Sequence, residues 1–99
     1  MLFASKIREL RESKQMLQRH ISAALDMDNA MYCKIEKGER RAKREQIPLI
    51  ADILQADSEE LLTLWLADQI AEVVAEESVA IEALRVAEEK VKYNKNQQV

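Results

Sequence analysis

The spacing of apolar residues in the first half of the chain predicts four short helices. Apolar side chains recur every three or four positions, the period of one helix face, in residues 3–13, 17–25, 29–37 and 46–54. Asp28 is expected to cap the third helix, because its carboxylate can accept from the free N–H groups of the first turn. Gly38 stands where a glycine commonly ends a helix. The first half is therefore predicted to be a set of short helices with tight connections.

The apolar pattern becomes denser from residue 61 to residue 74 and changes phase at residues 75–78. We expect a fifth helix there, entered through the acidic run 57–60, since carboxylates favour the positive end of a helix. At the phase change we expect a break, with Ser78 capping a sixth helix over residues 79–92. One long bent helix is the alternative.

Composition supports an all-α fold. The chain has 99 residues, of which 47% are hydrophobic, and it contains one Gly and one Pro, so tight β-turns have few of their usual residues. The single cysteine, Cys33, excludes a disulfide within the chain. No apolar run approaches the roughly 18 residues of a membrane span, and the first ten residues carry charges where a signal peptide needs apolar ones. We expect a soluble cytoplasmic protein that does not contact a membrane.

Charge is distributed unevenly between the two halves of the chain. Residues 1–50 carry 11 Lys and Arg against 7 Asp and Glu, whereas residues 51–99 carry 4 against 11, within a net charge of −3. A basic first half and an acidic second half suggest that only the first half meets a polyanion.

Residues 17–38, LQRHISAALDMDNAMYCKIEKG, are the most informative segment. Two short helices separated by a turn and followed by Ile-Glu-Lys-Gly resemble the helix-turn-helix domains of the Cro and phage-repressor superfamily, the XRE-like regulators. The resemblance covers residues 3–65, and its most specific positions are Gln18, Ile21, Ala24, Leu25 and 35–38. It implies a five-helix lambda-repressor-like domain. Residues 37–44, followed by a Leu- and Trp-rich fifth helix, are also similar to controller proteins of restriction–modification systems, a much less specific match.

The chain departs from the family pattern at several positions. Gln15, Asp26 and Gln55 stand where the family often has Gly. Asp26 tolerates a left-handed backbone better than most residues, whereas the two glutamines predict longer or strained turns. The start of the fourth helix lacks its usual signal, because Lys43 replaces a usual Ser or Thr cap and Pro48 lies inside the expected helix. Tyr32 replaces an aliphatic core residue, and its ring fits if its hydroxyl reaches the surface.

The resemblance implies which side chains meet DNA. The third helix would enter the major groove and read base edges, with its outward positions being Asn29, Ala30, Cys33 and Lys34. An amide such as that of Asn29 can pair with adenine, and Ala30 can pack on a thymine methyl. Phosphate contacts are expected from the start of the second helix and from the basic loop, that is from Gln18, Arg19, Lys37, Arg40, Arg41, Lys43 and Arg44.

Several of these residues have a second interpretation. Asn29 is also an ordinary helix-start residue, and Lys34 suits a phosphate as well as guanine. Cys33 is interpreted as a small groove-facing spacer, with a redox switch as the alternative. The loop cations can simply be solvated. His20 is the only histidine, so it cannot belong to a catalytic or metal cluster.

The apolar stripe of the second half is wider than one small domain needs. Regulators of this type bind inverted repeats as symmetric pairs, so we predict a helical homodimer interface of Leu62, Trp65, Leu66, Ile70, Val73, Val74 and Leu84. The alternative is an intramolecular helical hairpin. We divide the chain into a DNA-binding domain (1–57), a C-terminal dimerisation arm (58–93) and a flexible tail (94–99).

The sequence therefore predicts a transcriptional regulator that binds double-stranded DNA as a homodimer. The alternative is an antitoxin-type module that binds a partner protein through its arm and regulates its own operon. We find no nucleophile–histidine pair, metal-ligand spacing or phosphate loop, and expect no enzyme activity, cofactor, metal or small-molecule ligand.

Overall fold

The computed structural model describes residues 1–97, which are helical with short connections and include no β-strand. The elements are α1 (Leu2–Ser13), α2 (Gln18–Ala24), α3 (Asn29–Glu36), the 3₁₀ turn η1 (Arg44–Gln46), α4 (Ile47–Leu54), α5 (Ser58–Val74) and α6 (Ala80–Gln97). The predicted all-α class is confirmed. The first four helices fall within one or two residues of the predicted bounds.

The predicted break after the fifth helix is also confirmed, since α5 ends at Val74 and α6 begins at Ala80. The end of the chain differs from the prediction. Residues 94–97, expected in the polar tail, continue α6 to Gln97. Side chains that are polar on all sides do not stop a helix that already has a first turn, because propagation requires no apolar face. The last two residues of the predicted tail, 98–99, lie outside the described residues.

Close contacts divide the chain into two compact units, the first being Met1–Asp68 and the second beginning at Gln69. The first part of α5 thus packs with α1–α4. The functional division at residue 57 stays a prediction. Structurally, however, the unit that carries α2 and α3 also needs the start of α5, whose Leu61 is fully buried.

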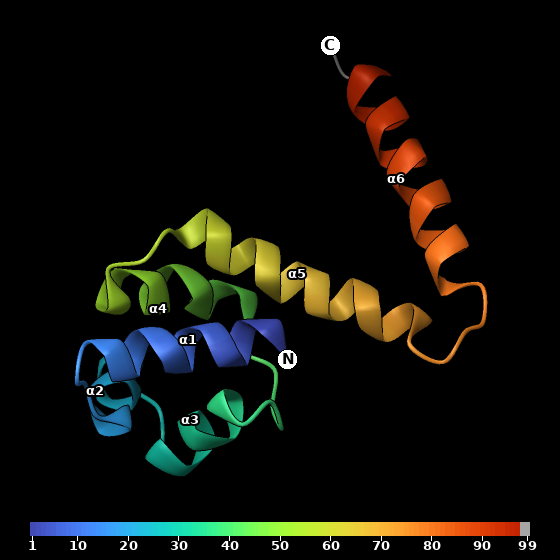
Figure 1. The fold of residues 1–99 in the computed structure, drawn as a ribbon. Helices are drawn as coiled ribbons and strands as arrows, with labels where there is room; N and C mark the ends of the chain where they lie inside the picture. The colour runs from blue at the N-terminus through green and yellow to red at the C-terminus, as the bar shows by residue number, and fades with distance from the viewer. Residues whose placement is uncertain (98–99) are drawn as a thin grey trace. The chain divides into compact units, whose positions relative to one another are not determined.

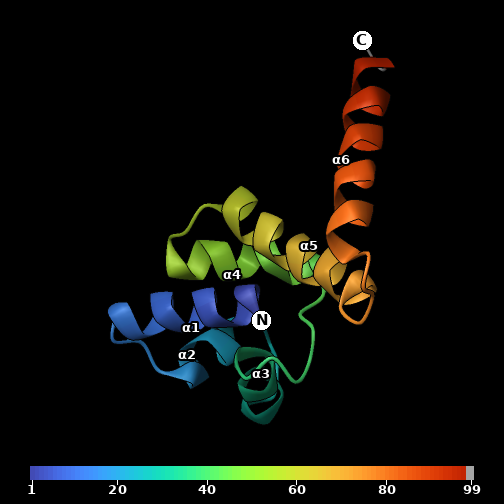
Figure 2. The same cartoon turned by 45° about the vertical axis from the view of Figure 1, so that its right-hand side comes forward.

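In the first unit, α1 lies between α4 on one side and α2 and α3 on the other (Figures 1 and 2). Each of these helices turns its apolar face toward this centre, which is why periods of three and four predicted them. The buried cluster consists of Phe3, Ile7, Ile21, Tyr32, Ile35, Ala42, Ile47, Ile50, Ala51, Leu54 and Leu61. Each fully buried large aliphatic side chain contributes about 1.5–3 kcal/mol, so this closed core holds the unit together.

Helices α1 to α4 all end with the same backbone closure. A residue with positive φ follows each helix, namely Gln15 (56°), Asp26 (53°), Gly38 (79°) and Gln55 (54°). Its N–H bonds the carbonyl three residues back, and the next N–H bonds the carbonyl five residues back. This is the Schellman motif. The turns at Gln15 and Gln55 are therefore no longer than the turn at Gly38. Their backbone has the same geometry, and it is strained because a residue with a side chain adopts a left-handed conformation there.

Asp68 of α5 closes the beginning of α1. Its carboxylate oxygens accept from the backbone N–H groups of Leu2 (2.8 Å) and Phe3 (3.0 Å). The first N–H groups of a helix have no partner within the helix, and Met1 supplies no side-chain cap. A residue more than sixty positions away in sequence therefore satisfies this end.

Capping at the other helix starts is mostly local. Asp28 accepts from the N–H of Ala30 (2.9 Å), as predicted, and Asp57 accepts from the N–H of Glu59 (2.9 Å). Pro48 lies in the first turn of α4, where its missing N–H costs little. The 3₁₀ turn η1 leads into α4, and its Gln46 side chain accepts from the N–H of Lys43.

Helix α6 contains no buried residue. Its exposed apolar side chains include Ile81, Val86 and Val91. None of the helices within residues 1–97 is both long enough and apolar enough to cross a membrane.

Candidate nucleic-acid interface

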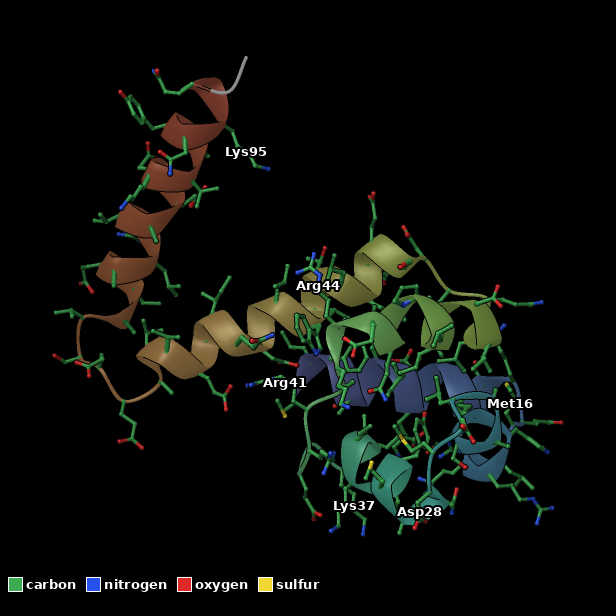
Figure 3. The ribbon with its side chains drawn as sticks, turned by 180° about the vertical axis from the view of Figure 1, so that it is seen from behind. Met16, Asp28, Lys37, Arg41, Arg44 and Lys95 are labelled. Atoms are coloured by element: carbon green, nitrogen blue, oxygen red, sulfur yellow. The ribbon has the colours of Figure 1, made fainter. Side chains whose placement is uncertain are left out.

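Helix α3 has one face in the core and one face in solvent. Tyr32, Ile35 and Glu36 are buried. Of the four predicted base-reading residues, Asn29, Ala30 and Lys34 are exposed and Cys33 is half-buried. Figure 3 shows Asp28 and Lys37 at the two ends of this helix, with Arg41 on the segment that follows it.

The side chain of Asn29 is held by a buried serine. Ser22 of α2 is 3% exposed, and its Oγ lies 3.2 Å from Asn29 Oδ1 and 3.3 Å from the carbonyl oxygen of Arg19. A hydroxyl has only one hydrogen to donate, so these two acceptors share it. The contact restricts the rotamers of Asn29, and Ser22 is a positioning residue that the sequence did not reveal.

Gln18 is held by a buried carboxylate. Its Nε2 donates to Glu36 Oε1 at 3.1 Å, and Arg11 binds the same carboxylate through Nε (2.7 Å) and Nη2 (3.0 Å). This network joins α1, α2 and α3. Burial alone would raise the pKa of Glu36, but the bonds from Arg11 and Gln18 outweigh it and hold the pKa below its ordinary value. One amide hydrogen of Gln18 is left for a further acceptor.

The hydroxyl of Tyr32 does not reach the surface, contrary to the condition set by the sequence analysis. Tyr32 is 0% exposed, and among residues 1–97 its oxygen has no partner in hydrogen-bond geometry. Burial, together with the neighbouring Glu36 carboxylate, raises the pKa of this phenol well above its ordinary value. The ring fits the aliphatic position, at the cost of a desolvated hydroxyl.

The predicted phosphate-binding cations lie at the surface. The exposed residues are Arg19, Lys37, Arg40, Arg41, Lys43 and Arg44. Lys34 of α3 is also exposed, and it lines a hollow together with Arg40. The ion pairs found within residues 1–97 do not involve Arg19, Lys34, Lys37, Arg40, Lys43 or Arg44.

Two hollows flank the first turn of α3 and bring the two groups of predicted residues together. One is lined by Arg11, Leu17, Gln18, Arg19 and Asn29. The other is lined by Asp28, Ala30, Met31, Lys34 and Arg40. Each hollow thus combines at least one predicted base-reading residue with at least one predicted phosphate-binding residue.

A hydrogen bond from α5 fixes the basic loop, residues 38–44. The indole Nε1 of Trp65 donates to the carbonyl of Ala42 at 2.8 Å, and Ala42 is buried. Arg40, Arg41 and Lys43 are therefore attached to a fixed point in the middle of the loop. No local pattern in the sequence indicates this bond between residues 23 positions apart.

The seven predicted interface residues differ in exposure. Leu62 and Trp65 pack against the core of the first unit, so both contribute to folding of that unit. Leu66, Ile70 and Val73 are exposed, by 39%, 53% and 81%. Val74 and Leu84 are half-buried.

Among residues 1–97, no three His, Cys, Asp or Glu side chains gather closely enough to hold a metal ion. Comparisons with models of known protein families, with curated proteins and with solved structures find no match to this chain. The geometry of the chain itself therefore carries the functional interpretation.

Proposed function

We propose that the chain is a sequence-specific DNA-binding transcriptional regulator of the XRE helix-turn-helix type that acts as a homodimer. The turn between α2 and α3 would place the first turn of α3 in the major groove. The observation that carries the proposal is the pair of hollows beside that turn, since each joins a base-reading candidate to a phosphate-binding candidate. Phosphate contacts orient a protein on the duplex, and base contacts specify the sequence.

The electrostatics of this face also support the proposal. Six exposed cations of the first unit have no carboxylate partner within residues 1–97. Three of them, Arg19, Lys34 and Arg40, line the two hollows, so a polyanion there would gain their attraction and release its counterions. Asp26 and Asp28 oppose this attraction at the turn. Asp28 also accepts a capping hydrogen bond from the N–H of Ala30. A serine at this position would accept the same bond without the negative charge.

Selection from a pool of random double-stranded DNA, followed by footprinting, tests the function. We expect enrichment of an inverted repeat whose protection weakens as salt rises. Absence of any enriched sequence at low salt, with folded protein, would overturn the proposal.

Variants separate the two kinds of contact. Asn29→Ala should relax preference at one base position, with a loss of discrimination of about 1–3 kcal/mol. Ser22→Ala should reproduce part of that relaxation, because Asn29 loses its positioning contact. Arg40→Ala should weaken binding to all sequences alike and reduce the salt slope by about 1. Lys6→Ala, which removes the same charge from α1 where it meets Glu60 of α5, is the matched control and should change neither.

The antitoxin-type alternative is favoured by the exposed apolar side chains of α6, which a partner protein could cover. Affinity purification from the native cell tests it. Recovery of a co-encoded polypeptide in fixed ratio would support this alternative, whereas a stable homodimer of the pure protein would count against it.

A further inference from the structure

Helix α6 exposes apolar surface that nothing within residues 1–97 buries. Ile81, Val86 and Val91 are 59%, 70% and 53% exposed. A run of exposed aliphatic residues along a soluble helix is typical of a surface that meets another chain.

Four apolar residues of α6 form a continuous stripe, in which Val91 is exposed and Leu84 is half-buried. Ala80, Leu84, Ala87 and Val91 follow one another at spacings of four, three and four residues, which places them in line along one side of the helix. This is the spacing of a coiled-coil seam. The stripe alternates small and large side chains.

The charges of α6 and of the connection before it are arranged by sign along the chain. The acidic residues come first, at Glu76, Glu77, Glu82, Glu88 and Glu89, with Arg85 as the exception. The second part carries Lys90, Lys92 and Lys95. Lys92 also meets Glu88 of its own helix at 3.0 Å, but both side chains are 62% exposed, so this pair leaves the overall asymmetry in place.

We propose that α6 pairs antiparallel with α6 of a second copy of this chain. Parallel pairing would set the glutamates of one copy beside those of the other, and likewise the lysines, which is unfavourable. Antiparallel pairing brings Lys90, Lys92 and Lys95 of each chain toward the acidic segment 76–82 of its partner. The inference rests on the homodimer of the proposed function and specifies the geometry of its arm.

The alternation of small and large residues in the stripe fixes the register. With the two-fold axis between Arg85 and Val86, Ala80 lies opposite the partner's Val91, and Leu84 lies opposite the partner's Ala87. Each large side chain then faces a small one, as in well-packed helix pairs. In the same register Lys95 lies beyond the start of the partner's α6, toward the connection that carries Glu76 and Glu77.

Cysteine cross-linking tests the orientation directly. In a Cys33→Ala background, Ala80→Cys and Val91→Cys are prepared as separate proteins, and each is oxidised with oxidised glutathione, alone and mixed in equal amounts. We expect a covalent dimer mainly in the mixture, at least fivefold above either protein alone. Strong self-linking of each single variant would show parallel pairing and overturn the proposal. So would the absence of cross-linking in every sample.

Charge variants test the cause of the orientation. Changing Lys90, Lys92 and Lys95 together to Glu should weaken self-association at least tenfold in sedimentation equilibrium. Adding Glu76→Lys, Glu77→Lys and Glu82→Lys to the same chain should restore it, because the charges are then exchanged and not removed. Failure of the second set to restore association would contradict the charge argument. Circular dichroism of each variant checks that α6 remains helical.

All these measurements are made without DNA, so they separate this inference from the proposed function. Antiparallel cross-linking by a protein that binds no DNA would leave the pairing intact and overturn the DNA-binding proposal. A monomeric protein that still binds single half-sites would overturn the pairing and leave the DNA-binding proposal standing.

Discussion

The first unit and helix α6 differ in the burial of their apolar residues. Eleven residues of the first unit form a buried cluster that α1 to α5 close from all sides. Helix α6 has no buried residue, although its sequence is also amphipathic. The contrast teaches that an apolar period predicts a helix in both regions but does not tell whether the partner surface belongs to the same chain. One region is complete as it stands, and the other has its apolar face uncovered.

The largest expected effect concerns the C-terminal boundary of the first unit. A chain truncated after Asp68 should keep a cooperative thermal transition, whereas a chain truncated after Asp57 should not fold. The shorter chain loses fully buried Leu61, the Trp65 bond and the Asp68 cap, and removal of one large core side chain alone costs about 2–5 kcal/mol. Thermal melts followed by circular dichroism measure both. A folded 1–57 fragment would show that the start of α5 is dispensable.

The second prediction concerns the polar network of Arg11, Gln18 and Glu36 in the first unit. Glu36→Gln removes the buried charged partner of Arg11, which then keeps only the exposed Glu12 at 3.8 Å, and the loss of one partner of a buried pair costs about 3–5 kcal/mol. Glu36 is 2% and Arg11 13% exposed in their side chains. We expect the free energy of unfolding, measured in urea at pH 7, to fall by about 3 kcal/mol. Glu89→Gln on α6 is the matched control and should change stability by less than about 0.5 kcal/mol.

The difference between wild type and Glu36→Gln should also depend on pH. The pKa of Glu36 is lower in the folded chain than in the unfolded one, so its contribution is complete above the unfolded value of about 4.3 and is lost as pH falls through the folded value. Unfolding curves between pH 7 and pH 3 should therefore converge in acid. A constant difference over this range would contradict the ionised pair.

A smaller effect is expected from Trp65→Phe. The substitution keeps much of the ring packing but removes the donor to the Ala42 carbonyl, which costs about 1–2 kcal/mol because a buried acceptor loses its partner. Hydrogen exchange of the backbone amides in residues 38–44 should accelerate, while that of α6 should not change. Unchanged exchange in the loop would show that Trp65 does not fix it.

The smallest expected effect is a gain. Gln55→Gly relieves a left-handed residue at φ 54°, where a side chain costs about 1–2 kcal/mol. The greater entropy of glycine in the unfolded chain offsets part of this, so the net gain should be about 0.5–1 kcal/mol in urea unfolding. Gln97→Gly, near the end of α6, is the control and should not stabilise the chain. A net loss for Gln55→Gly would mean that the glutamine side chain makes a compensating contribution.

Features set by neighbouring residues could be predicted from the sequence. The helix periods, the Asp28 cap, the Gly38 closure and the break before α6 all depend on a few adjacent positions, and the structure confirms each of them. The exposure of Ala30 and Lys34 also follows from their place on α3.

Features set by distant residues could not be predicted. The bonds from Asp68 to the start of α1 and from Trp65 to Ala42 join positions that only the folded chain brings together. The same is true of the Ser22 contact with Asn29. Tyr32 shows a second reason why prediction from the sequence fails. The fit of its ring in the core outweighs the free-energy cost of its buried hydroxyl, and the residue type alone does not show which of these two effects is larger.

The cap on α1 has a consequence for the order in which the protein is made. The ribosome synthesises α1 before α5, yet the carboxylate that completes the first turn of α1 belongs to residue 68. At roughly 5–20 residues per second, several seconds pass before Asp68 is even joined to the chain. During that interval the N-terminal helix has an open end and no α5 to cover it. Helix α1 is thus synthesised before the other helices of its unit and is among the last of them to be completed, and a nascent chain stalled before residue 68 would present an unfinished core to the chaperones around it.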